Sequence, residues 1–301
     1  MKSKVIFKGV LLSLLFSSVT AFAQDENITL LLHKDTTAAI RRVVQHPYKF
    51  RVQVVYTQVR RNSEGKLAFV GSDFRINDDE YFYPATLVKL PIAALALEKI
   101  NSLHIGGLSK DSYLKVQAPY VSKKEKPVTI RENILRMLVL NDKNAFNRLY
   151  DFLGQEYINN RLEQLGYKKT RIIQRFYSGS ADDNKITGPY IITDSLGKTL
   201  YKGVRITCRK IFYNPIKETK IGTGYMDGKK FVRVAKDFHS SNNFPLSEAH
   251  RMLISIIYPD ETALENRFNI SAEDFEFLKL ALGSYPREAG IVEWLNDEKD
   301  L

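Results

Sequence analysis

The sequence contains a single cysteine, Cys208, so no disulfide can form within the chain and stability must come from a hydrophobic core. Cys208 lies in an alternating apolar run, which predicts a small buried side chain. The histidines lack the spacing of metal ligands, and no glycine-rich phosphate-binding loop is present. We find no internal repeat and no low-complexity linker. From these absences we expect neither a metal nor a cofactor.

Long apolar runs are also scarce, and the one that stands out lies at the N-terminus. Three lysines precede a short apolar core and a small-x-small cleavage site: Lys2, Lys4 and Lys8, then 10–16, then Ala21-Phe22-Ala23. This order predicts a signal peptide over residues 1–23. A membrane anchor is the alternative, but the segment is short for a span of about 20 residues. No cysteine directly follows the cleavage site, so we expect a periplasmic or secreted chain that begins at Gln24 without a stable membrane anchor.

Positive charge exceeds negative charge, with 45 lysines and arginines against 34 aspartates and glutamates and a net charge of +11. The three lysines of the signal peptide account for part of this excess, which leaves +8 on the processed chain. Such a surface suits anionic polymers of the cell envelope, and it also suits plain solubility. Export and the lack of a matching motif disfavour nucleic acid as a partner.

Side-chain periodicity predicts a helix and then a hairpin in the first part of the chain. The helix covers residues 34–45, ends before Pro47 and turns four side chains toward a core: Ala38, Ile40, Val43 and Val44. The strands cover 49–59 and 67–74, with a turn at 62–65 between them.

Later segments predict a helical cluster, a second group of strands and two final helices. The helices cover 129–140, 144–153, 155–166, 246–258 and 272–283, and the strand-like runs cover 188–193, 199–213 and a hairpin at 219–236. Thr129 with Glu132, and Ser271 with Asp274, are typical helix starts. Turns are expected at 194–197 and at Asp227-Gly228, and the acidic tail from Glu293, with Trp294 in it, is expected to fray. The order predicts an α/β (α+β) fold with helices inserted between two halves of an antiparallel sheet.

The stretch Tyr83-Pro84-Ala85-Thr86-Leu87-Val88-Lys89-Leu90-Pro91 runs directly into an apolar helix at 92–100. Thr86 and Lys89 are three residues apart, so one helical turn places them on the same face. A lysine in that position can accept the proton of the hydroxyl, and the helix N-terminus favours developing negative charge. This is the spacing of a Ser-x-x-Lys acyl-transfer site, with threonine in place of serine.

A second polar segment, Asn141-Asp142-Lys143, lies between an apolar helix end and the next helix. Such a loop can present its side chains into a cleft. The alternative is an ordinary joint between helices, with Asn141 or Asp142 as the N-cap.

Together the two segments resemble the serine β-lactamase and penicillin-binding-protein superfamily, whose motifs are Pro-Ala-Ser-x-x-Lys and Ser-Asp-Asn. The likeness covers about 35–170 and is greatest to class A-like sequences, including exported "serine hydrolase" proteins of Bacteroidetes-type bacteria. It implies an antiparallel sheet flanked by helices, with a helical subdomain at about 84–166 of a single domain at 24–301.

The resemblance also implies roles for individual residues. Thr86 takes the place of the nucleophile, Lys89 that of the activating lysine, and Asn141 that of the serine that relays protons. Lys143 stands where an asparagine binds the substrate amide, while Asp142 and Asn147 match structural residues. The threonine methyl crowds the path of attack, and an amide cannot relay a proton at neutral pH.

The chain departs from the family pattern in two further places. No glutamate occurs from 164 to 217, where class A enzymes place the one that activates water, and Asp182 and Asp183 read better as solvated loop carboxylates. The best match to the third motif, Lys-Thr-Gly, is Lys220-Ile221-Gly222-Thr223-Gly224, with Lys220, Gly222 and Thr223 as substrate-binding residues. If Lys220 is instead an ordinary hairpin residue, the chain stops before the true motif and the sheet lacks a strand.

The resemblance implies an exported hydrolase that acts by acyl transfer on a β-lactam or a peptidoglycan-stem amide, with weak activity. The alternative is a pseudoenzyme that keeps the cleft and binds cell-wall fragments.

Overall fold

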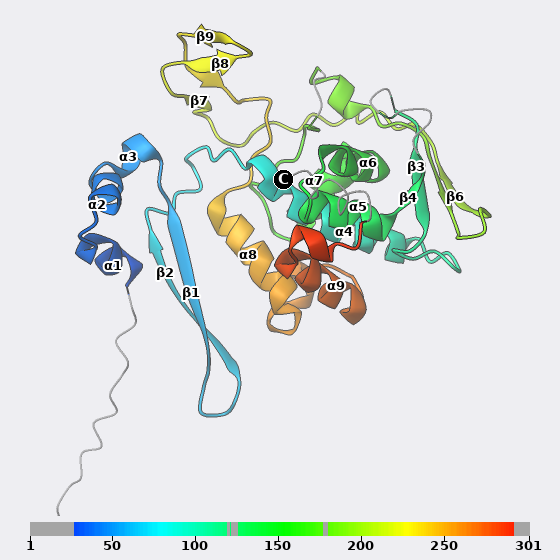
Figure 1. Ribbon diagram of the computed structural model, residues 1–301, viewed down its shortest axis with the longest axis horizontal. Helices are drawn as coiled ribbons and strands as arrows, with labels where there is room; N and C mark the ends of the chain where they lie inside the picture. Colours follow the sequence, from blue (N-terminus) through cyan, green and yellow to red (C-terminus); the bar gives the residue numbers. More distant parts are fainter. Residues whose placement is uncertain (1–26, 119–120, 122–125, 177–179, 292–301) are drawn as a thin grey trace, which may run out of the picture.

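A computed structural model describes residues 27–118, 121, 126–176 and 180–291 of the chain (Figure 1). The predicted signal peptide and the acidic tail with Trp294 lie outside the described residues. No helix in the described part is long and apolar enough to cross a membrane.

The helix α4 (Lys89–Ser102) forms the centre of the molecule, with α5 (Ile130–Leu138), α6 (Lys143–Leu153) and α9 (Ala272–Gly283) packed against it. Every side chain from Ile92 to Leu97 is fully buried. A helix that is apolar on all sides is stable only when it is enclosed, and its alanines let neighbouring helices approach closely. Pro91 is tolerated because it lies in the first turn, where its missing N–H has no helical partner to lose.

The cluster continues with α7 (Gln155–Gln164) and with α8 (Leu246–Ile257), which packs on α9 and on the first strand. Two predicted helix starts are confirmed. The Thr129 hydroxyl accepts from the Glu132 N–H at 3.0 Å, and the Ser271 hydroxyl accepts from the Asp274 N–H at 3.1 Å. These caps satisfy backbone donors that have no partner within the first helical turn.

The described strands form antiparallel pairs, which confirms the α/β (α+β) class. β1 (Val54–Arg61) pairs with β2 (Leu67–Phe74), and a separate four-stranded sheet has the order β4 (Val128–Thr129), β3 (Tyr113–Val116), β5 (Tyr190–Thr193), β6 (Thr199–Gly203). β7 (Lys220–Ile221) pairs with β10 (Lys236–Asp237), and β8 (Tyr225–Asp227) pairs with β9 (Lys230–Val232). The expectation that later strands complete the first hairpin into one sheet is not met among the described residues: no strand there pairs with β1 or β2 except each other.

The N-terminal elements differ from the sequence prediction. The helix expected at 34–45 begins only at Ala38, as α2 (Ala38–Gln45), and a separate helix, α1 (Ile28–Lys34), precedes it. The Asp35 carboxylate accepts from the N–H and hydroxyl of Thr37, and this turn separates the two helices. Of the four predicted core side chains of this helix only Val44 is buried, and Ile40 is 37% exposed. The strand predicted from residue 49 begins at Val54, since Pro47 starts the short helix α3 (Pro47–Phe50).

The long strand predicted at 199–213 ends at Gly203. The segment beyond it makes only an isolated bridge, between Thr207 and Ile186, so the apolar alternation there does not reflect a buried strand face. Cys208 in this segment is buried as predicted. The turn at 194–197 is confirmed, with the Asp194 carboxylate accepting from the N–H groups of Leu196 and Lys198, both at 2.9 Å.

Candidate active site

Thr86 lies in a single 3₁₀ turn, Ala85–Val88, that leads into α4. The Lys89 N–H donates to the Thr86 carbonyl, so the two residues are one turn apart, as the sequence spacing predicts. Ala85 has a φ of 44°, a left-handed conformation that alanine adopts at a cost of about 1 kcal/mol. The Thr86 side chain is exposed, while its neighbours Pro84 and Val88 are buried. The fold therefore presents this hydroxyl at the surface end of a buried helix.

Lys89 is 3% exposed, which is unusual for a lysine. Its ammonium group donates to the Asn141 side-chain oxygen and lies 5.9 Å from the centroid of the Phe176 ring. Burial lowers the pKa of Lys89 to about 8, the Asp142 carboxylate opposes that change, and the positive charge of Lys143 adds to it. With such a pKa about a tenth of the Lys89 amines are neutral at pH 7 and able to accept a proton.

The alternative reading of the Asn141-Asp142-Lys143 segment, a joint between helices with an N-cap, is confirmed. Asp142 caps α6, since its carboxylate accepts from the N–H groups of Asn144 at 2.7 Å and Ala145 at 3.1 Å. Asn141, with a φ of 60°, turns its side chain back onto Lys89. Asparagine tolerates this left-handed conformation better than most residues. The helix cap therefore fixes the loop, and the loop places an amide at the lysine.

Asn147 is fully buried in α6, and its side-chain oxygen accepts from the Phe176 N–H at 2.9 Å. The Phe176 ring packs edge-on against Phe146, with 4.7 Å between ring centroids. Asn147 thus holds the segment that brings an aromatic ring to the Lys89 amine. The sequence does not predict this role of Phe176. Phe176 lies in a loop and is positioned by an asparagine far away in the chain, and no local sequence pattern marks such a residue.

Lys220 lies in β7, which forms a two-stranded ribbon with β10. Gly222 and Thr223 directly follow β7, and all three residues are exposed. Phe238, which directly follows β10, stacks on Tyr81 with 5.3 Å between ring centroids and packs at a tilt against Tyr83 with 5.2 Å between centroids. The ribbon is therefore attached to the segment just before Thr86. Among the described residues, however, no hydrogen bond or ion pair joins Lys220, Gly222 or Thr223 to Thr86, Lys89 or Asn141, and their substrate-binding role stays a prediction.

Asp182 and Asp183 are exposed, in agreement with their reading as solvated loop carboxylates. Asp183 accepts from the N–H and hydroxyl of Ser180, both at 2.8 Å, and these bonds lower the pKa of Asp183. Asp182 pairs with Lys185 at 2.8 Å. Both carboxylates are thus engaged by partners within their own loop. In the described part of the chain no group of histidine, cysteine and carboxylate side chains is arranged to hold a metal ion.

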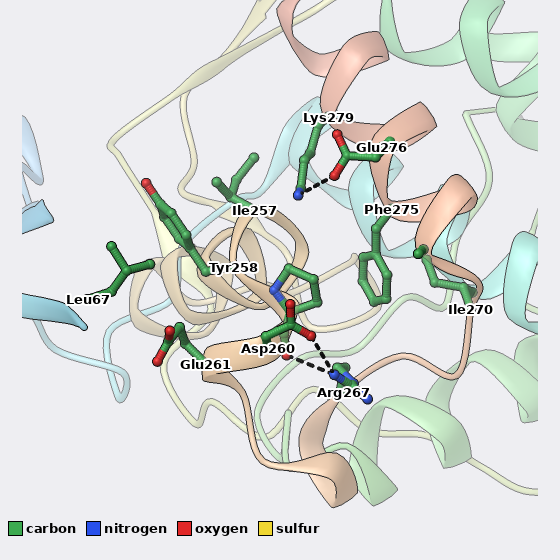
Figure 2. A pocket seen from close by; sticks show the side chains of 12 residues that line it. Leu67, Ile257, Tyr258, Asp260, Glu261, Arg267, Ile270, Phe275, Glu276 and Lys279 are labelled. Carbon is green, nitrogen blue, oxygen red and sulfur yellow. Dashed lines mark hydrogen bonds and ion pairs between the residues drawn. The ribbon is translucent and has the colours of Figure 1, made fainter. Parts of the chain in front are cut away.

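A cavity of about 350 Å³ lies where β2, α8 and α9 meet, and none of the predicted site residues lines it (Figure 2). Four of its five charged side chains pair with one another: Arg267 lies 3.4 Å from Asp260, and Lys279 lies 2.7 Å from Glu276. The hydroxyl, buried lysine and amide at the start of α4 are the stronger candidate for a reactive site.

In a comparison with known sequence families, residues 35–203, which contain these three residues, match the Beta-lactamase enzyme family. The chain belongs to the β-lactamase enzyme family. The matched segment contains every predicted site residue from Thr86 to Asn147, and it ends before Lys220. No relative was found among curated protein sequences.

Three solved structures show weak similarity to this β-lactamase-family chain. The chromosome-encoded beta-lactamase of Vibrio parahaemolyticus is 13% identical, with a TM-score of 0.42 over 81% of this chain and 70% of that chain. A double mutant of that enzyme is 12% identical, with a TM-score of 0.40 and the same coverage. L2 complexed with relebactam is 15% identical, with a TM-score of 0.33 over 49% of this chain and 53% of that chain.

Proposed function

We propose that this β-lactamase-family protein is an exported acyl-transfer hydrolase that acts on a β-lactam or a peptidoglycan-stem amide. The observation that carries the proposal is the buried Lys89, which lies one turn from the exposed Thr86 hydroxyl and has a pKa lowered to about 8. A base is most effective when its pKa is near the working pH, and burial brings this lysine into that range.

In the proposed reaction the Thr86 oxygen attacks the amide carbonyl carbon while the neutral Lys89 amine accepts the hydroxyl proton. The C–N bond then breaks, the proton passes to the leaving nitrogen, and an ester on Thr86 remains. Water hydrolyses that ester and restores the hydroxyl. The N–H groups at the start of α4 favour the negative charge that develops on the carbonyl oxygen.

Three features support weak rather than efficient turnover. The methyl group of Thr86 crowds the approach of the carbonyl. Asn141 occupies the position from which the family's serine relays a proton, and an amide cannot perform that step. No glutamate from 164 to 217 is available to activate the hydrolytic water. We therefore expect the ester to form slowly and to persist.

The hydrogen bond from Lys89 to Asn141 also favours a second candidate function, a pseudoenzyme that binds cell-wall fragments. In that case the exposed Lys143 would hold a ligand carboxylate beside a lysine that no longer acts as a base.

Hydrolysis of a chromogenic cephalosporin and of a D-alanyl-D-alanine stem peptide, measured for the parent and for Thr86→Ala, tests the proposal. The enzyme hypothesis requires slow hydrolysis of at least one substrate that is lost in the alanine variant. Binding of the stem peptide by calorimetry, with no hydrolysis above the alanine background and no covalent adduct on Thr86, would establish the pseudoenzyme instead.

A further inference from the structure

The segment after the family match is unusually basic, and it projects from the rest of the fold. From Lys220 to Lys236 the chain has five basic residues and one acidic residue. This stretch contains the β8–β9 hairpin, which lies beyond the β7 ribbon and apart from the helical cluster (Figure 1). Neither the family match nor the proposed reaction explains this hairpin.

The tip of the hairpin carries a pair of exposed apolar side chains. Met226 and Phe231 lie directly opposite each other in the β8–β9 register, and they are 59% and 55% exposed. Val234, two residues beyond β9, is 58% exposed. The tip is well formed, because Gly228 has a φ of 57° at the first central position of the two-residue turn, where a type II′ turn requires a positive value.

Basic residues flank this apolar pair along the chain. Lys229 and Lys230 lie at the turn, Arg233 and Lys236 follow β9, and all four are exposed. Asp227 is the only acidic residue of this stretch. Apolar side chains set among lysines and arginines are typical of segments that enter the interface of an anionic membrane.

The base of the hairpin is fixed to the body of the protein. The buried Thr219 donates to the Asp237 carboxylate at 2.8 Å, and Phe238 stacks on Tyr81. The Tyr81 hydroxyl in turn donates to the Asn242 carbonyl at 2.8 Å. These contacts attach the ribbon that carries the hairpin to the body of the protein, so a surface bound at the tip would lie on one side of the domain.

We propose that the β8–β9 tip docks the protein reversibly on an anionic phospholipid surface, with Met226 and Phe231 in the interface and the basic residues on the headgroup phosphates. A bilayer fits better than a soluble polyanion, because a polyanion neutralises the lysines but leaves the apolar pair in water. Each lysine near an anionic surface contributes about fivefold to binding. The two apolar side chains together contribute at least about tenfold.

Co-sedimentation with vesicles tests the proposal, with the processed chain that begins at Gln24. The vesicles are phosphatidylcholine alone, or phosphatidylcholine and phosphatidylglycerol in equal parts, each at low and at high salt. We expect binding only to the anionic vesicles, and weaker binding at high salt. Lys229→Ser with Lys230→Ser should reduce it by about 25-fold, and Met226→Ser with Phe231→Ser by at least about tenfold.

Matched controls distinguish binding by the hairpin from binding by charged or apolar side chains elsewhere on the surface. The first control replaces two exposed lysines, Lys49 and Lys168, by serine. The second replaces Leu264 and Leu280, which are 74% and 71% exposed, by serine. Each control should leave vesicle binding unchanged within about twofold. All variants lie at exposed positions, and circular dichroism with thermal unfolding verifies that each is folded.

Three results would overturn the proposal. The first is a parent protein that does not bind anionic vesicles at all. The second is an equal loss of binding in the control and the hairpin variants, which would make net charge alone responsible. The third is binding that depends on the two lysines but not on Met226 and Phe231, which would mean that the tip adsorbs to any polyanion and does not enter a membrane interface.

Discussion

The buried amine of Lys89 predicts a pH-dependent difference in stability between the parent and Lys89→Met. The pKa of this lysine is about 8 in the folded protein, against an ordinary value of 10.5 that applies when the chain is unfolded. The interval corresponds to about 3 kcal/mol of folding free energy at 1.36 kcal/mol per pKa unit. We expect a smaller destabilisation, of about 2 kcal/mol, for two reasons. The Asn141 side-chain oxygen accepts a hydrogen bond from the charged amine, and the neighbouring Thr86 is exposed, so solvent close by screens the charge.

The sign follows from which form is charged. Below pH 8 the lysine is protonated in both states, and the folded protein bears the whole cost of burying the charge. As the pH rises from 8 to 10.5 the folded protein loses this proton before the unfolded chain does, so the cost disappears. Methionine fills a similar volume without a charge. Lys89→Met should therefore be more stable than the parent by about 2 kcal/mol near pH 7, and the advantage should vanish near pH 10.5.

Urea denaturation of both proteins at pH 7, 9 and 10.5 measures this difference, and other titrating groups cancel because they are common to both proteins. The exposed Lys168 gives the matched control: Lys168→Met should show no pH-dependent difference from the parent. An advantage of Lys89→Met that is constant over this pH range would refute the lowered pKa, and with it the assignment of Lys89 as the base.

Three further variants test other parts of the site. Thr86→Ser restores the family's nucleophile and removes the crowding methyl, so the rate of acylation by a penicillin should rise by at least about tenfold; an unchanged rate would place the defect outside the nucleophile. Asn141→Ser restores a hydroxyl that can relay a proton, so it should raise the rate of acylation further in the Thr86→Ser background. It should also lower the free energy of unfolding in urea by about 1 kcal/mol, since serine is less suited to a φ of 60°. No gain in acylation would argue against a relay at this position. Asn147→Ala leaves the part-buried Phe176 N–H without its acceptor and should cost about 1–3 kcal/mol, whereas Asn144→Ala, one turn earlier and exposed, should cost under about 0.5 kcal/mol. Equal costs would contradict the positioning role of Asn147.

The elements that the sequence predicts well are those with local signals. The caps at Thr129 and Ser271 and the strand 67–74 need only a few neighbouring residues to be recognised, and the structure confirms each of them. The strand expected at 199–213 fails beyond Gly203, because alternation describes only the side chains and does not supply a partner strand. Whether such a run pairs depends on segments far away in the chain.

In the candidate site, too, relations between neighbouring residues could be predicted, and contacts between distant residues could not. The spacing of Thr86 and Lys89 was sufficient to predict that they share one turn, because that relation is local to one helix. The contact between Lys89 and Asn141 spans 52 residues, and it was expected only through the family resemblance. Phe176 could not be predicted at all, since its place depends on a buried side chain 29 residues away, Asn147. The position of Lys220 relative to Thr86 likewise depends on the packing of Phe238, which no motif encodes.

Intact-protein mass spectrometry after long incubation with benzylpenicillin tests the central claim most directly. Opening of the β-lactam ring releases no fragment, so acylation adds the whole mass of the drug. The proposed mechanism predicts this adduct on the parent, mapped by peptide analysis to Thr86, and its absence from Thr86→Ala. An unmodified parent, or an adduct that persists in Thr86→Ala, would contradict the assignment of Thr86 as the nucleophile.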